Sequence, residues 1–377
     1  MGNITHRERV LRAVAREETD RVPIDFGSTF ATTITLGGYE RLKAYLGVKG
    51  ETSVLSERSQ LAVVDEDVLQ RFDTDTRMLV HGNPERGAIE RPSGASYRDE
   101  WGVVRSRPAG GHYYVSGPTF PGDLTVREVE EFSWPDAHDP GYTRGVAERA
   151  RDLHENTDYA VVLNPPVGFI HQSQFMRGFD RWMMDFLECP AVAEALMDRV
   201  LDIWLTISGD LIDAADGCFD LVFYADDIAH QDGPFVSPEM YQMYVKPRQR
   251  RLVEFIKSRT SAPFVYHSCG AVAPLLPDLV DIGIDVLNPV QVAAAGMDTR
   301  RLKQQYGHVL AFWGAIDTQH VLPFGTVEDV RAEVRRRIED LDRGGGYVVN
   351  SVHNIQPDVP PENICAMFDA AREFHAT

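Results

Sequence analysis

Cysteine is scarce in this 377-residue sequence, and long apolar segments are absent from it. The four cysteines are Cys189, Cys218, Cys269 and Cys365. So few thiols in so long a chain do not indicate a disulfide framework, and no apolar run approaches the ~20 residues that a membrane-spanning helix needs. Residues 1–10 lack the apolar stretch of a secretory signal. We therefore expect a cytoplasmic protein whose thiols stay reduced.

Positive charge is also in deficit. Lys and Arg number 38 against 57 Asp and Glu, which gives a formal net charge of -19. Nucleic acids and anionic membrane surfaces bind basic patches, so this balance argues against both as partners. We expect an acidic, solvated surface of the ordinary kind.

Three common catalytic motifs are missing. No G-x-G-x-x-G follows a strand-like segment, which disfavours a dinucleotide-binding fold. No G-x-S-x-G elbow supports serine-hydrolase chemistry, and no P-loop pattern supports nucleotide hydrolysis.

The chain does contain short apolar segments that alternate with helical patterns. The strand-like segments are residues 21–26, 76–80, 159–164, 221–227, 263–269, 285–290, 308–317 and 347–353. The helical patterns are residues 189–207, 238–257, 298–306, 327–341 and 361–374. Alternating β and α segments predict a parallel sheet, and eight strands over this length predict an α/β fold, a single (β/α)8 TIM barrel that spans residues 1–377. Residues 82–134 are rich in aromatic and glycine clusters and are predicted to form an inserted β-hairpin or meander.

Polar residues end most of these strands. They are Asp25, Asn164, Asp226, Asp227, His267, Cys269, Asn288, Asp317, Asn350 and His353. Barrel enzymes place their chemistry at the C-terminal ends of the strands, so these residues together predict a polar pocket. Each taken singly could instead be a cap or a turn residue. Tyr224 and Trp313 could wall a substrate pocket or pack in the core.

The most informative stretch is His267-Ser268-Cys269 at the end of a predicted strand. Side chains two residues apart on a strand point the same way, so an imidazole and a thiol project together. This pair suits zinc if further ligands exist. His353 is the best third ligand, although it could equally be a turn histidine bonded to backbone.

Asp226 and Asp227 are the candidate catalytic carboxylates, as a fourth metal ligand or as an acid/base group. The alternative role is to cap the helix that begins near Pro238. Adjacent strand residues face opposite ways, so we expect one of the two to enter the pocket.

Five segments carry a resemblance to a known family. They are RERVL at residues 7–11, DRVP at 20–23, GPFVSPE at 233–239, WGAID at 313–317 and VHNIQPDVPPENI at 352–364. Together they resemble the uroporphyrinogen decarboxylase superfamily over nearly the whole chain. The resemblance implies a (β/α)8 barrel, in agreement with the strand count.

Two departures favour one branch of that superfamily. True decarboxylases carry an R-Q-A-G-R segment after the first strand, whereas residues 26–33 read FGSTFATT and contain no arginine. Corrinoid-dependent methyltransferases carry His-x-Cys at the position of His267 and Cys269, with a third zinc ligand near the last strand. That ligand is a cysteine in the coenzyme M methyltransferases, and here its neighbourhood offers His353. An imidazole in place of a thiolate leaves zinc more positive and a better Lewis acid for an ether oxygen.

The resemblance therefore implies a zinc-dependent methyltransferase that moves a methyl group between a small methoxylated substrate and a corrinoid (cobalamin). The corrinoid is expected to be supplied by a partner protein. Substrate-binding roles are expected for Asp25, Asn164, Tyr224, Asn288, Trp313 and Asn350. The alternatives are a thiol-directed methylcobamide methyltransferase, a metal-free decarboxylase of a small acid, and a non-catalytic sensor. A homodimer is expected.

Overall fold

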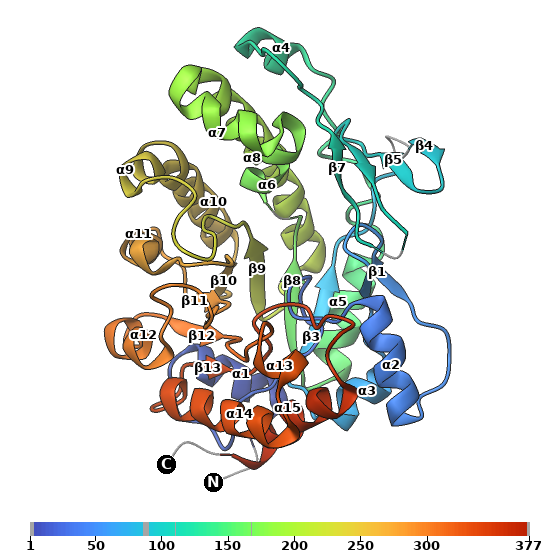
Figure 1. The fold of residues 1–377 in the computed structure, drawn as a ribbon, viewed down its shortest axis with the longest axis vertical. Coiled ribbons are helices and arrows are strands. Elements are labelled where there is room, and N and C mark those ends of the chain that lie inside the picture. Colours follow the sequence, from blue (N-terminus) through green and yellow to red (C-terminus); the bar gives the residue numbers. More distant parts are fainter. Residues whose placement is uncertain (1–3, 86–89, 110, 167, 375–377) are drawn as a thin grey trace.

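The computed structural model describes residues 4–374 except 86–89, 110 and 167. Its centre is a seven-stranded parallel sheet with the order β13-β12-β11-β10-β9-β8-β3, curled as a barrel wall (Figure 1). The strands are β3 (Thr76–Val80), β8 (Ala160–Asn164), β9 (Leu221–Ala225), β10 (Phe264–His267), β11 (Val286–Asn288), β12 (Ala311–Trp313) and β13 (Tyr347–Val348). Each lies within a segment that the sequence predicts to be a strand, which confirms the parallel α/β architecture.

The predicted first strand, residues 21–26, is reduced to one parallel bridge between Ile24 and Val349. The segment still closes the barrel. On one side the Asp25 N–H donates to the carbonyl of Val349 (2.9 Å), and on the other the Asp75 N–H donates to the carbonyl of Ile24 (2.7 Å). A regular ladder does not form there because the Ile24 N–H donates to the Asp75 carboxylate (2.7 Å) instead of a neighbouring strand.

Helices surround this sheet. They are α1 (His6–Val14), α2 (Leu36–Leu46), α3 (Glu66–Arg71), α4 (Val126–Glu131), α5 (Val146–Asn156), α6 (Phe169–Arg177), α7 (Phe179–Glu188), α8 (Pro190–Ala215), α9 (Pro238–Met240), α10 (Lys246–Arg259), α11 (Leu276–Asp281), α12 (Thr299–Tyr306), α13 (Val321–Phe324), α14 (Val327–Leu341) and α15 (Pro361–Glu373). The predicted helix at residues 189–207 is longer than expected, and the one at 238–257 is interrupted by a π-helical turn, η1 (Tyr241–Val245). A 3-10 turn, η2 (Ala273–Leu275), precedes α11. Within the described residues, no helix is long and apolar enough to cross a membrane.

The predicted insertion at residues 82–134 is a meander. It contains a four-stranded antiparallel sheet of β4 (Glu90–Ser93), β5 (Ser96–Arg98), β6 (Val104–Ser106) and β7 (Tyr114–Gly117). Residues 86–89 and 110 of the predicted region lie outside the described residues. A short hairpin that the sequence did not predict, β1 (Val54–Ser56) and β2 (Leu61–Ala62), lies near this insert in sequence and in space. The insert stands beyond the C-terminal ends of the barrel strands (Figure 1).

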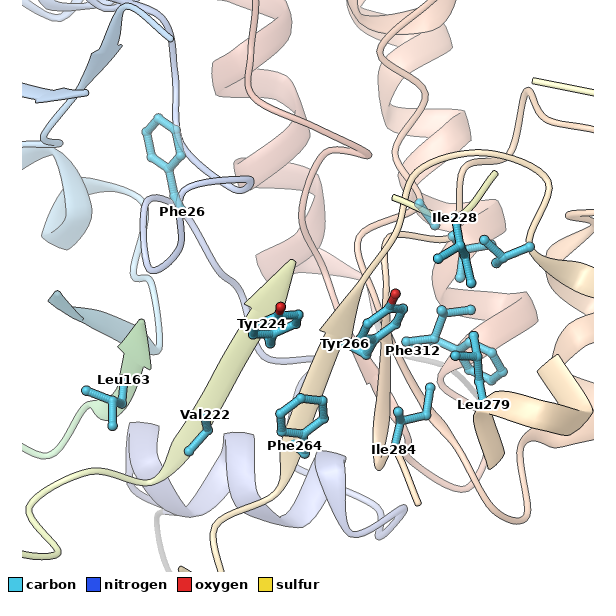
Figure 2. Packing of buried hydrophobic residues seen from close by; sticks show 14 of the residues in the cluster. Phe26, Leu163, Val222, Tyr224, Ile228, Phe264, Tyr266, Leu279, Ile284 and Phe312 are labelled. Carbon is cyan, nitrogen blue, oxygen red and sulfur yellow. The ribbon is translucent and has the colours of Figure 1, made fainter. Parts of the chain in front are cut away.

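Both faces of the parallel sheet are buried, as continuous apolar strands require. Outward-facing side chains such as Val222, Tyr224, Phe264 and Tyr266 pack towards the helices (Figure 2). Their inward-facing neighbours join a second apolar cluster, which includes Val10 and Val14 of α1. Helix α1 therefore closes the N-terminal end of the barrel, and polar groups gather at the other end.

Candidate metal centre

His267, Cys269 and His353 come together at the C-terminal end of the barrel. Their ligand atoms all lie within 4.8 Å of one another. The Cys269 Sγ lies 3.6 Å from the His267 Nε2, and the two imidazole rings are 5.5 Å apart between centroids. The sequence predicted this grouping of residues from β10 and from the chain after β13.

The turn after β10 keeps the Cys269 thiol on the same side of the chain as the His267 imidazole. Gly270 has a φ of +91°. A Cβ at this position would come within 2.6 to 2.7 Å of the backbone of Ala229 and His230. Only glycine fits this close approach without strain, so Cys269 is held at the end of the strand.

Asn288 orients the His267 ring. Its Oδ1 lies 2.6 Å from the His267 Nδ1 and accepts the proton of that nitrogen, which leaves the Nε2 turned towards Cys269. Asn288 in turn donates to the carbonyl of Trp313 (3.3 Å). A partner of this kind fixes the tautomer and the direction of a metal-binding histidine. Asn288, which was predicted to bind substrate, thus makes a contact that suits a residue that holds His267 in place.

The electrostatics of the three side chains suit a cation. Burial lowers the pKa of His267, against the opposing charge of Asp227. Burial and the neighbouring His267 lower the pKa of His353 to about 4, so this imidazole is neutral at pH 7 and can bind a metal. Burial and the charge of Asp227 raise the pKa of the Cys269 thiol well above its ordinary value, so this thiol would bind a metal with release of its proton.

The spacing of the donors fits zinc. A tetrahedral zinc binds nitrogen at ~2.0–2.1 Å and sulfur at ~2.3 Å, which separates those two atoms by about 3.6 Å. The observed distance between the Cys269 Sγ and the His267 Nε2 is 3.6 Å. Two nitrogens and one sulfur form a donor set typical of catalytic zinc, in which the fourth position of the tetrahedron is taken by water or substrate.

Asp227 lies beside this group. Its Oδ1 accepts the backbone N–H of Cys269 (2.7 Å) and lies 3.8 Å from the His267 Nε2. Asp226 is fully buried and accepts the N–H groups of Ile170 and His171 at the start of α6 (2.8 and 2.9 Å). The two adjacent carboxylates therefore face different neighbours, and Asp227 is the one nearer the candidate metal-binding group.

His171 is a neighbour of the site that the sequence did not single out. Its Nδ1 lies 3.3 Å from Asp226 and its Nε2 lies 3.5 Å from Asp227. Burial alone would lower the pKa of His171, but the hydrogen bonds and charges of the two carboxylates outweigh it and raise the pKa to about 10. Burial raises the pKa of Asp226, whereas His171 and His267 outweigh burial at Asp227 and lower its pKa. No sequence spacing links His171 to a strand 55 residues later.

The other predicted substrate-binding residues are buried and bonded to protein. Asp25 accepts from Thr76 Oγ1 (2.7 Å) and from the Trp313 Nε1 (2.9 Å). The Tyr224 hydroxyl accepts the N–H of Phe169 (3.0 Å). The remaining two are Asn350, which donates to the Asp25 carbonyl (2.6 Å), and Asn164, which donates to the Ser28 carbonyl (2.9 Å). These contacts hold the rim together, and direct substrate binding by these five residues stays a prediction.

Known proteins similar to this chain fall into two groups. A "Uroporphyrinogen decarboxylase" of Methylococcus capsulatus is 30% identical over 119 residues, which cover 32% of either chain. A "Methylcobamide:CoM methyltransferase MtaA" of Methanosarcina barkeri is 26% identical over 157 residues, which cover 42% of either chain. Each match thus spans less than half of the curated relative's length.

The fold has a full-length counterpart. A solved structure described as a methyltransferase from Methanosarcina mazei covers 99% of both chains with a TM-score of 0.67 and 19% sequence identity. Residues 114–374 match the family model described as "Uroporphyrinogen decarboxylase (URO-D)". The barrel, its rim and this match together show that the chain belongs to the uroporphyrinogen decarboxylase family.

Proposed function

We propose that this protein is a zinc-dependent methyltransferase that moves a methyl group between a small O-methylated substrate and a corrinoid carried by a partner protein. The observation that carries the proposal is the convergence of His267, Cys269 and His353 within 4.8 Å. The similarity to a protein named as a methylcobamide:CoM methyltransferase supports the reaction class.

The chain's own residues have distinct tasks in this proposal. His267, Cys269 and His353 hold the zinc, which when bound supplies a Lewis acid for the oxygen that carries the methyl group. Asn288 keeps the His267 Nε2 directed at the site. Asp227 fixes the Cys269 backbone and forms an ion pair with His171, whose Nε2 lies 3.5 Å from the Asp227 Oδ2. This pair is the proposed proton source for the oxygen that leaves.

His353 is the reason to favour an oxygen-linked methyl group. Two imidazoles and one thiolate leave zinc more electrophilic than a site with a second thiolate. Such a site favours cleavage of an ether over activation of a bound thiolate. Methyl transfer to a thiol is the second candidate, because the relative from Methanosarcina barkeri is named for coenzyme M.

Decarboxylation of a small acid without metal is a weaker alternative. Several relatives carry the name uroporphyrinogen decarboxylase. However, residues 26–33 contain no arginine to bind porphyrin acid groups, and the three soft donors at the rim have no task in a metal-free reaction.

The test combines metal analysis with a methyl-transfer assay. We expect about one zinc per chain, and zinc-dependent methylation of cob(I)alamin by members of a panel of methoxylated aromatic compounds. Thiol acceptors with methylcobalamin test the second candidate in the same preparation. An active protein that contains no zinc would contradict the proposal. The cytoplasmic location, the corrinoid partner and the homodimer stay predictions.

A further inference from the structure

Three side-chain amides join the loops around the turn that follows β10. Gln231 lies in the loop after β9, Gln291 in the loop after β11, and Gln319 in the loop after β12. The N–H of Gly270, the residue after Cys269, donates to the Gln291 Oε1 (2.7 Å). The Gln291 Nε2 donates to the Gln231 Oε1 (2.9 Å), and the Gln319 Nε2 donates to the same oxygen (3.3 Å). A chain of amides that begins beside Cys269 thus links four loops at the rim of the barrel.

Backbone groups fix the orientation of the first two amides. A peptide N–H can only donate, so the Gly270 N–H requires the oxygen of Gln291, whose Nε2 then faces Gln231. At the other end, the Gln231 Nε2 donates to the carbonyl of Ala293, which can only accept. Reversing either amide would set donor against donor and acceptor against acceptor. Gln231 and Gln291 therefore hold each other in one arrangement.

The three amides differ in burial. Gln291 is 8% exposed, Gln231 is half-buried and Gln319 is exposed. A buried peptide N–H that loses its acceptor has no water to replace it, whereas water replaces an exposed hydrogen bond at little cost. The contribution of these side chains should therefore fall in the order Gln291, Gln231, Gln319.

The end of β11 and the loop after it support both residues that β10 and its turn bring to the metal centre. Asn288 holds the His267 ring through its Nδ1 (2.6 Å), and Gln291 holds the peptide N–H that follows Cys269 (2.7 Å). The N–H of Cys269 itself donates to Asp227 (2.7 Å). The peptide groups on both sides of the Cys269 Cα are therefore fixed, and together they set the direction of its Cα–Cβ bond and of the thiol.

We propose that Gln291 is a positioning residue for the metal centre, which keeps the Cys269 thiol directed at His267, and that Gln231 acts through Gln291. This inference rests on the proposed function, in which Cys269 binds zinc. A ligand that is already held in place loses less conformational freedom when the metal binds. Without Gln291 the turn loses its buried acceptor, the thiol adopts other directions, and zinc binds more weakly.

The first measurement is the zinc affinity of the full-length protein, by competition with a chromogenic chelator. Gln291→Met keeps an unbranched side chain of similar length but removes both hydrogen bonds, and should weaken zinc binding about 10-fold or more. Gln231→Met should weaken it less, and Gln319→Ala by less than about 2-fold. The control is Asn363→Leu on α15, which removes two buried hydrogen bonds to backbone carbonyls (2.9 and 2.8 Å) and should keep the wild-type affinity.

Three further measurements separate positioning from a general loss of stability. The double variant Gln291→Met/Gln231→Met should bind zinc as tightly as Gln291→Met, because Gln231 acts through Gln291. With cobalt(II) in place of zinc, the thiolate-to-metal charge-transfer absorption should be weaker in Gln291→Met and unchanged in Asn363→Leu. In the metal-free protein, hydrogen exchange of the Gly270 N–H should be about 10-fold or more faster in Gln291→Met than in wild type.

Either of two results would overturn the inference. One is a Gln291→Met protein with wild-type zinc affinity or wild-type exchange at Gly270. The other is a double variant in which the two losses of affinity multiply, which would show that Gln231 acts independently. The proposed function fails separately. A wild-type protein that binds no zinc or transfers no methyl group would refute that function, whereas faster Gly270 exchange in metal-free Gln291→Met would still show that Gln291 holds the turn.

Discussion

The two ends of the barrel satisfy their polar groups in opposite ways. At the N-terminal end, the fully buried Asp75 accepts from Arg9 (2.6 Å), Arg21 (2.7 Å) and His6 (2.8 Å). At the C-terminal end, His267, Cys269 and His353 face one another with ligand atoms turned inwards. Opposite charges that pair with one another stabilise a fold. Polar side chains that come close together without pairing are available to bind a ligand.

The largest effect is expected from Cys269→Ala. Removing the sulfur should reduce bound zinc from about one per chain to less than about a tenth, because two imidazoles alone bind zinc weakly. Elemental analysis after dialysis measures this. Cys189→Ala is the matched control and should keep its zinc, since Cys189 is exposed and belongs to no metal-binding group among the described residues. The metal-free forms of both variants should unfold with similar free energies.

Asp75→Ala should lower the stability of the fold and leave zinc binding unchanged. It leaves Arg9 and Arg21 without their shared buried carboxylate, so the free energy of unfolding should fall by about 3–5 kcal/mol while zinc content stays the same. Denaturant titration measures the loss. Glu8→Gln removes the exposed ion pair with Arg12 but retains an acceptor for the Thr5 N–H, so it should cost less than about 0.5 kcal/mol. If Asp75→Ala and Glu8→Gln lowered the free energy of unfolding by similar amounts, the buried ion pairs at the N-terminal end would not be a special source of stability.

Asn288→Ala tests the support of the metal centre rather than its ligands. Without its acceptor, the His267 ring loses the hydrogen bond that fixes its orientation, and zinc affinity should fall about 10- to 100-fold. Competition with a chromogenic chelator measures the affinity. Asn288→Asp retains an acceptor at the same place and should stay closer to wild type. Equal zinc affinity in the alanine variant would show that the contact is incidental.

Asp342 is an exception at the N-terminal end, where it precedes β13. Its Oδ1 is buried and has no hydrogen-bond partner in the described part of the chain. Burial raises its pKa to about 7, against the charge of Lys303. The protonated form therefore stabilises the fold at low pH, and this contribution is lost as the pH rises from about 4 through 7.

Asp342→Asn should consequently raise the free energy of unfolding by about 1–2 kcal/mol at pH 8 and change it little at pH 4. Denaturant titrations at the two pH values give the comparison. A gain of equal size at both values would mean that titration of Asp342 is not the cause.

Much of the fold follows from the sequence because parallel strands that are buried on both faces read as continuous apolar runs. The common direction of the His267 and Cys269 side chains was predictable for the same reason, since a strand fixes the direction of every second side chain. The irregularity of the first strand was not predictable. The Ile24 N–H donates to the side chain of Asp75, 51 residues away, and such a contact leaves no local pattern in the sequence. His171 escaped prediction because it acquires its neighbours only through packing of α6 against other elements.

The insert carries a consequence for how this protein could change. The residues predicted to form the insert, 82–134, precede β8 in the chain, whereas His267, Cys269 and His353 belong to the second half of the barrel. The segment that stands beyond the strand ends and the candidate metal-binding group are therefore encoded in separate stretches of the chain. Substitutions in the insert can accumulate without changing any of the three candidate metal-binding residues.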